Sequence, residues 1–92
     1  MNNKFLQDLK KKRSANFDKE IADHIYKDCL RQIENANDVN VTQYLFEVPS
    51  ILIGKPLYNV VVITQLIIKQ LKKLQFKVMF IEPNKIHIDW TI

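Results

Sequence analysis

Three side chains that could do chemistry lie close together near the middle of the first half of the chain: His24, Asp28 and Cys29. His24 and Asp28 have the i,i+4 spacing that places two residues on one face of a helix. All three types can bind zinc, but a zinc site needs three or four converging ligands at the spacing of a zinc ribbon or a zincin. Cys29 falls on the apolar stripe of the predicted helix, so we expect a core cysteine, a solvated His24 and no bound metal.

A second candidate pair, His87 and Asp89, shares one face of a predicted strand near the end of the chain. The pair could act as acid and base, but no nucleophile accompanies it in the sequence. The turn at Gly54-Lys55-Pro56 has one glycine followed by proline, which leaves too few free amides to hold a phosphate. The sequence therefore predicts a protein that is not an enzyme and that has no catalytic residues and no cofactor.

The segment around His87 alternates strictly between apolar and polar residues, which is typical of a strand with one buried face. The apolar residues are Ile86, Ile88, Trp90 and Ile92. A preceding strand is predicted from Phe76, Val78 and Phe80, and Glu82-Pro83-Asn84-Lys85 forms the turn between the two. Proline cannot adopt the positive φ of a primed two-residue turn, so we expect a slightly longer loop or a bulge. Another strand is expected over residues 41–48, and Pro49 ends it.

Two long helices are predicted to pack against these strands. The first covers residues 16–37, where apolar side chains recur at i+4 spacing, and a separate short basic helix precedes it over residues 4–13. Ser14 and Asn16 are the candidate N-caps at which the helix restarts. The second covers residues 60–74 and is apolar on nearly all sides, so we expect so small a domain to leave part of it uncovered.

The predicted order of elements is α-β-α-β-β, an α+β fold with a small, three-stranded, mostly antiparallel sheet and two main helices packed on one face. Trp90 is expected in the seam between sheet and helices. Residues 1–15 form a basic N-terminal arm or short helix, and residues 16–92 form a single domain. The longest apolar stretch, residues 57–68, is far shorter than the roughly 20 residues that span a bilayer, so no membrane insertion is expected.

The formal net charge is +4, and lysine supplies nearly all of it. Eight of the 14 basic residues lie in two clusters, of which the first is Lys10, Lys11, Lys12 and Arg13 and the second is Lys69, Lys72, Lys73 and Lys77. Such clusters can be solvated helix faces that complement the helix dipole, or they can contact an anionic partner, either nucleic acid or an acidic protein surface. A helix followed by a β-hairpin also occurs in winged-helix domains, which favours nucleic-acid binding as the alternative function. The segment between the first strand and the second helix is, however, too short and too proline-interrupted for a further helix.

Surplus apolar residues indicate a protein partner, because a small soluble domain rarely exposes a large apolar surface without one. The candidate partner-binding residues lie on an N-terminal edge and on the flanks of the second long helix: Phe5, Leu6, Leu9, Val61, Val62, Leu66 and Ile68.

The order of several short motifs resembles that of a small family of uncharacterised proteins. These motifs are Phe46-Glu47-Val48-Pro49, the Gly54 to Asn59 entry into the second helix, Phe76-Lys77-Val78, and the Pro83-Asn84 turn before Ile88-Asp89-Trp90. Nucleocytoplasmic large DNA viruses, the giant viruses, encode this family. The family pattern has glycine where this chain has Gln75, so the resemblance does not extend to a left-handed helix C-cap there.

This resemblance implies a viral origin, a location in the virion and in the host cytoplasm during infection, and no defined activity. Together with the apolar surplus, it leads us to expect a small non-enzymatic structural or interaction protein. The chain would be a minor virion component that binds other viral proteins or itself. The alternative is a small basic nucleic-acid-binding module with a winged-helix-like helix-hairpin unit.

Overall fold

The computed structural model describes residues 3–91, apart from the side chains of residues 3, 5 and 7–16. The elements in chain order are α1 (Asn3–Asp38), β1 (Gln43–Glu47), α2 (Val60–Lys73), β2 (Lys77–Ile81) and β3 (Lys85–Asp89). This order confirms the predicted α-β-α-β-β sequence and the α+β class.

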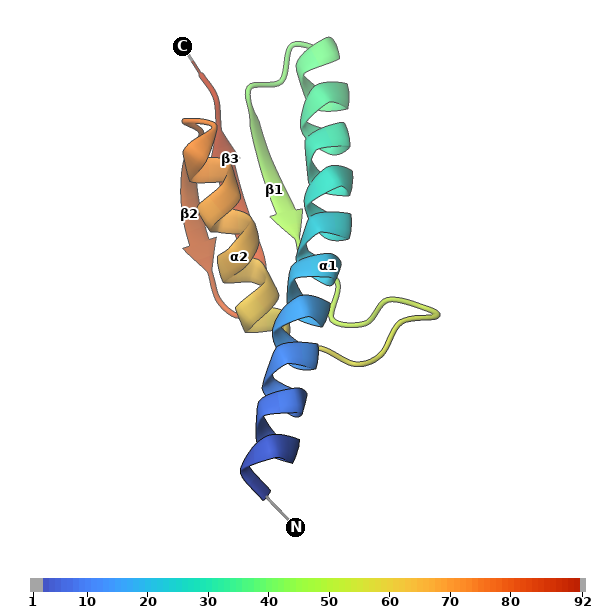
Figure 1. The fold of residues 1–92 in the computed structure, drawn as a ribbon. Helices are drawn as coiled ribbons and strands as arrows, with labels where there is room; N and C mark the ends of the chain where they lie inside the picture. The colour runs from blue at the N-terminus through green and yellow to red at the C-terminus, as the bar shows by residue number, and fades with distance from the viewer. Residues whose placement is uncertain (1–2, 92) are drawn as a thin grey trace.

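The three strands form one sheet in the order β1-β3-β2, and both neighbouring pairs are antiparallel. Because β1 and β2 both run opposite to β3, they are parallel to each other, and α2 connects them as in a split β-α-β unit. Both helices pack on one face, with α1 against β1 and α2 against β2 and β3 (Figure 1). The two-layer arrangement with helices on one face is confirmed.

The central strand β3 carries the buried floor of the sheet. Ile86 and Ile88 are fully buried. Ile86 lies opposite Phe46 of β1 and Phe80 of β2, so the apolar residues of three strands meet in one row. This confirms the predicted alternation within the strand, while Ile92 lies outside the described residues.

The first helix is longer than predicted, since α1 is one continuous helix from Asn3 to Asp38. The predicted restart at Ser14 or Asn16 is wrong. The segment contains neither glycine nor proline, so nothing interrupts its backbone hydrogen bonds, and weak capping preferences do not end a helix by themselves. The first turns extend beyond the rest of the molecule (Figure 1), which measures 60 × 26 × 20 Å. That residues 1–15 act as a separate arm stays a prediction.

The second helix begins at its predicted cap. The Asn59 side chain accepts hydrogen bonds from the backbone N–H groups of Val61 at 3.0 Å and Val62 at 3.3 Å. Four α2 residues are fully buried in the core, namely Ile63, Thr64, Ile67 and Leu71. Thr64 satisfies its hydroxyl by donating to the carbonyl of Val60 at 2.7 Å. From α1, the core receives Ile21, Ala22, Ile25, Cys29 and Ile33.

Both helices end in a left-handed residue that is not glycine. At the end of α2, Gln75 has φ +69°, its N–H donates to the carbonyl of Lys72, and the N–H of Phe76 donates to Leu71. After α1, the N–H of Asn40 (φ +65°) donates to the carbonyl of Asn37, and the N–H of Val41 donates to Ala36. This pair of hydrogen bonds at each helix end is the Schellman motif. Glycine is therefore not required at position 75, because these backbone hydrogen bonds hold glutamine in the left-handed conformation.

Trp90 joins the end of α1 to the hairpin, as predicted for the seam. Its indole N–H donates to the side-chain oxygen of Asn37 at 3.1 Å. Its ring meets that of Phe76 edge to face, with centroids 6.2 Å apart and an interplanar angle of 88°. Trp90 is half-buried, so it packs against the core from the rim rather than from its centre.

The hairpin turn has three residues between the paired Ile81 and Lys85, which confirms the expected longer loop. Its Glu82–Pro83 peptide bond is cis. The buried Asn84 side chain donates to the carbonyl of Val48 at 2.8 Å, and the N–H of Val48 donates back to the carbonyl of Asn84 at 2.8 Å. This turn is thereby attached to the end of β1. Within residues 3–91, no helix combines the length and the apolar character needed to cross a membrane.

Replacing Trp90 tests the seam. We expect Trp90→Ala to lower the free energy of unfolding by about 2–4 kcal/mol, because it removes a large aromatic contact. Trp90→Phe keeps a ring against Phe76 but loses the hydrogen bond to Asn37, and should cost about 1 kcal/mol. Urea unfolding followed by circular dichroism measures both. Wild-type stability of the alanine variant would place Trp90 outside the cooperative fold.

Replacing Gln75 tests the left-handed cap. Gln75→Gly should raise the free energy of unfolding by about 0.5–1 kcal/mol, because glycine adopts a positive φ without steric cost and loses only part of that gain to chain entropy. Gln75→Ala is the matched control, since alanine meets the same steric cost as glutamine. Equal stability of the glycine and alanine variants would contradict a strained backbone at this position.

Candidate functional site

The connection between β1 and α2 displays exposed aliphatic side chains. In what we call the aliphatic loop, residues 49–59, the exposed fractions are 63% for Ile51, 102% for Ile53 and 78% for Leu57. Figure 1 shows that this loop projects from the body of the molecule beside α1. Exposed apolar side chains gathered on one loop are typical of a surface that another protein covers.

Hydrogen bonds and a turn fix the shape of the aliphatic loop. The hydroxyl of Tyr58 donates to the carbonyl of Pro49, which joins the two ends of the loop. The N–H of Lys55 donates to the carbonyl of Leu52 at 3.1 Å, and Gly54 has φ +82°, the backbone that glycine favours at the third position of a type II turn. Local sequence patterns do not predict this exposed surface, although Ile51, Ile53 and Leu57 differ from the polar residues of most turns.

The predicted partner-binding residues of α2 divide between surface and core. Val61 and Val62 are exposed on the first turn, and Leu66 is half-buried. Ile68 is only 7% exposed and packs in the core, so its prediction as a contact residue is wrong. Helix α2 is therefore covered by α1 and the sheet along most of its length. Its uncovered apolar part is the first turn.

The predicted N-terminal edge is described only in part. Leu6 is exposed on the projecting turns of α1. The side chains of Phe5 and Leu9 lie outside the described part of the structure. The same holds for those of the first basic cluster, Lys10, Lys11, Lys12 and Arg13.

The structure describes all four residues of the second basic cluster, three on α2 and Lys77 on β2, and they do not share one face. All four side chains, Lys69, Lys72, Lys73 and Lys77, are exposed. Lys69 and Lys73 line a groove of about 550 Å³ between α1 and α2, together with Lys19 from α1. We call it the lysine groove. Its other lining residues are Ala22, Asp23, Tyr26, Leu66, Gln70 and Leu74. Lys72 and Lys77 do not line it, so the cluster seen in the sequence is not one site in space.

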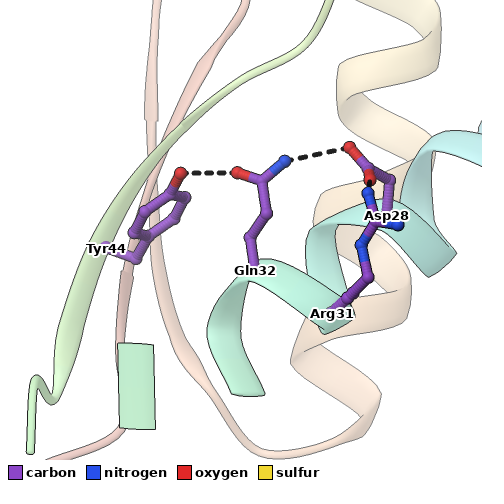
Figure 2. Close-up of polar contacts among 4 residues, drawn as sticks. All are labelled: Asp28, Arg31, Gln32 and Tyr44. Carbon is purple, nitrogen blue, oxygen red and sulfur yellow. Dashed lines mark hydrogen bonds and ion pairs between the residues drawn. The ribbon is translucent and has the colours of Figure 1, made fainter. Parts of the chain in front are cut away.

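A polar chain links α1 to β1 (Figure 2). The hydroxyl of Tyr44 donates to the side-chain oxygen of Gln32, whose amide nitrogen donates to Asp28 at 2.9 Å. The other carboxylate oxygen of Asp28 accepts from Arg31. Arg31 and Asp28 also line a cavity of about 460 Å³ whose further walls include His24 and Leu52. Because Asp28 already binds two donors, its role is to orient Arg31 and to join the helix to the sheet.

The fold separates the candidate metal-binding residues His24 and Cys29. Cys29 is fully buried in the core, whereas His24 is exposed, so the two do not face one site. In the part of the chain that the structure describes, no three His, Cys, Asp or Glu residues come together as metal ligands.

His87 and Asp89 lie on the open face of the sheet, each with a different partner. His87 Nε2 is 3.1 Å from the side-chain oxygen of Gln43. The backbone N–H of Thr91 donates to Asp89 at 2.8 Å, and this bond holds the pKa of that carboxyl below its usual range. In the sheet register, His87 is opposite Leu45 and Met79, two exposed apolar residues. The arrangement places His87 in an apolar row rather than in an acid-base pair.

The Cys29 thiol gives a test of this core. Burial, and next the nearby Asp28 carboxylate, raise its pKa from 9.0 to about 12. Because the thiolate is the reactive form, we expect iodoacetamide to label Cys29 slowly in the folded protein and rapidly in urea. The unfolded thiol ionises first, so the free energy of unfolding should fall as pH rises from about 9 towards 12, by up to about 1.4 kcal/mol per pH unit.

Cys29→Ala is the control for that titration, because lysines and tyrosines also titrate above pH 9. The alanine variant should lose less stability over the same range, and the difference between the two curves reports the thiol. Rapid labelling of the native protein would contradict a buried, protonated cysteine.

Comparison with known proteins identifies a family but not an activity. The model of the family of unknown function DUF5759 matches residues 1–72, which include α1, β1, the aliphatic loop and nearly all of α2. The hairpin of β2 and β3 lies beyond the matched residues. Neither the curated proteins nor the solved structures give a match to the chain. Because the matching model covers well over half of the sequence, the chain belongs to the DUF5759 family.

Proposed function

We propose that this chain is a non-enzymatic interaction protein of a large DNA virus, a minor virion component that binds other viral proteins. The observation that carries the proposal is the aliphatic loop, on which Ile51, Ile53 and Leu57 are all more than half exposed. A projecting loop with a fixed shape loses little conformational entropy on binding, which favours its use as a contact element. The exposed Val61 and Val62 continue the apolar surface into the first turn of α2.

Three of the side chains that could do chemistry are bound by neighbours or enclosed in the core, which supports a role without catalysis. Asp28 binds Arg31 and Gln32, Asp89 accepts from Thr91, and the thiol of Cys29 is enclosed in the core. The viral part of the proposal, with its location in the virion and the host cytoplasm, is supported by the resemblance of the motif order to that of giant-virus proteins.

The alternative is nucleic-acid binding by the exposed lysines of α2 and β2. Lys69, Lys72, Lys73 and Lys77 are all exposed, and a protein that neutralises several phosphates loses affinity steeply as salt rises. If the purified chain binds DNA or RNA at low salt, and if its affinity falls steeply as salt rises, nucleic-acid binding is favoured over protein binding through the aliphatic loop.

A triple substitution of the aliphatic loop tests the proposal. We expect Ile51→Ser, Ile53→Ser and Leu57→Ser together to leave the melting temperature nearly unchanged, because the three side chains are exposed. The same variant should be depleted about tenfold from purified particles, because a contact loses the burial of three aliphatic side chains. Quantitative mass spectrometry of particles made with each variant measures the depletion.

The matched control is the double variant Leu45→Ser and Met79→Ser, which removes two exposed apolar side chains from the open face of the sheet instead. It should enter particles as the wild type does. Absence of the wild-type chain from purified particles, or equal incorporation of the triple variant, would overturn the proposal.

A further inference from the structure

The lysine groove has an apolar floor between charged rims. Ala22 of α1 is buried, Tyr26 and Leu66 are half-buried, and Leu74, just after α2, is 53% exposed. The volume of about 550 Å³ is within the range of pockets that bind small molecules, so the groove is large enough to take several side chains of a partner. Two helices that border an apolar channel form the usual receptor for an amphipathic helix, whose apolar side chains enter the channel at i, i+3, i+4 and i+7 spacing.

The rims of the groove carry uncompensated positive charge. Lys19 stands on α1, and Lys69 and Lys73 stand on α2. Among the lining residues that the structure describes, Asp23 is the acidic one, and it forms an ion pair with Lys27 at 3.6 Å. None of the three rim lysines forms a hydrogen bond or an ion pair with another side chain that the structure describes. The groove therefore presents about three positive charges around an apolar centre.

We infer that the lysine groove binds an acidic amphipathic helix of a partner protein, with apolar side chains on the floor and carboxylates against Lys19, Lys69 and Lys73. The inference rests on the proposed function, which holds that the chain binds proteins. It adds the chemical character of one segment that a partner protein would supply. Charge complementarity selects the partner, because opposite potentials steer encounter and like charges exclude wrong partners.

The same charges disfavour the other occupants. A second copy of the chain has a net charge of +4, so its approach to three lysines is repulsive. Nucleic acid would satisfy the lysines but would leave Leu66 and Leu74 against a polar backbone. Its bases stack on exposed aromatic rings, whereas Tyr26, the one aromatic lining residue, is half-buried in the floor.

Tyr26 adds a polar contact to the floor. A tyrosine hydroxyl is protonated near neutral pH. Burial raises the pKa of the Tyr26 hydroxyl further above its usual value, with smaller effects from Cys29 and Asp23. A protonated phenol can donate a hydrogen bond to a carboxylate of the bound helix. A partner helix with lysine in place of glutamate could not accept this hydrogen bond, and the lysines of the rims would also repel it.

A designed peptide tests the inference with the full-length chain. The probe is a fluorescent helical peptide of about 18 residues with leucine at i, i+3, i+4 and i+7 positions and glutamate on the flanks. The control probe has lysine at every glutamate position. We expect fluorescence anisotropy to show binding of the glutamate peptide and at least about tenfold weaker binding of the lysine peptide.

Three variants assign the binding to the groove. The double variant Lys69→Glu and Lys73→Glu should lower affinity for the glutamate peptide about tenfold, because it reverses two rim charges. Leu74→Ser should lower it about threefold, since it removes apolar floor. Lys72→Glu is the matched control, because it makes the same kind of charge reversal on the same helix at a position outside the groove. It should change the affinity for the peptide less than about twofold. Circular dichroism confirms that each variant is folded.

Four outcomes would overturn the inference: no binding of the glutamate peptide by the wild type, wild-type affinity in the double variant, an equal loss in Lys72→Glu, or displacement of the peptide by a tighter-binding single-stranded oligonucleotide. The last result would assign the groove to nucleic acid. Peptide binding uses the purified chain alone, so it is independent of particle incorporation. A chain that binds the peptide but is absent from particles contradicts only the proposed function, and a chain in particles that ignores the peptide contradicts only this inference.

Discussion

The structure depends on the double pairing of β3. This strand is hydrogen-bonded to β1 on one side and to β2 on the other, and β1 and β2 meet only through it. Its inward residues, Ile86 and Ile88, are fully buried beneath the two helices. Since side chains alternate strictly along a strand, a shift of one residue would expose both isoleucines and bury His87 instead. The register is therefore fixed by burial, and the positions of the helices follow from it.

With both helices on one face, the sheet and the helices leave distinct surfaces. The open face carries polar residues around Leu45 and Met79, and the line where α1 meets α2 becomes the lysine groove. The aliphatic loop leaves the sheet after β1 and enters α2 at the Asn59 cap. Only Leu52 and Tyr58 of this loop pack against the core, so Ile51, Ile53 and Leu57 stay exposed. The candidate contact surfaces thus follow from the topology and not from local composition alone.

The sequence predicts the features that local periodicity and capping determine. The strands and the Asn59 cap belong to this group, because each depends on neighbours within a few residues. The continuity of α1 was missed, since Ser14 and Asn16 resemble caps and only the lack of a breaker opposes them. The left-handed Gln75 was missed because the bonds that close the helix end outweigh the intrinsic preference of glutamine. The exposed loop was missed because the sequence does not show which apolar residues lack a covering layer.

The lysine groove shows how tertiary structure changes the meaning of a charge cluster. In the sequence, Lys69, Lys72 and Lys73 form one basic segment with no preferred partner. On α2, the i,i+4 spacing places Lys69 and Lys73 on one side, and Lys72 turns away from them. Only the packing of α1 brings Lys19 opposite the first two and places an apolar floor between them. A diffuse positive segment attracts any anion, whereas two charged rims around an apolar channel also require shape and apolar contact from the ligand, and this requirement can supply specificity for a protein helix over nucleic acid.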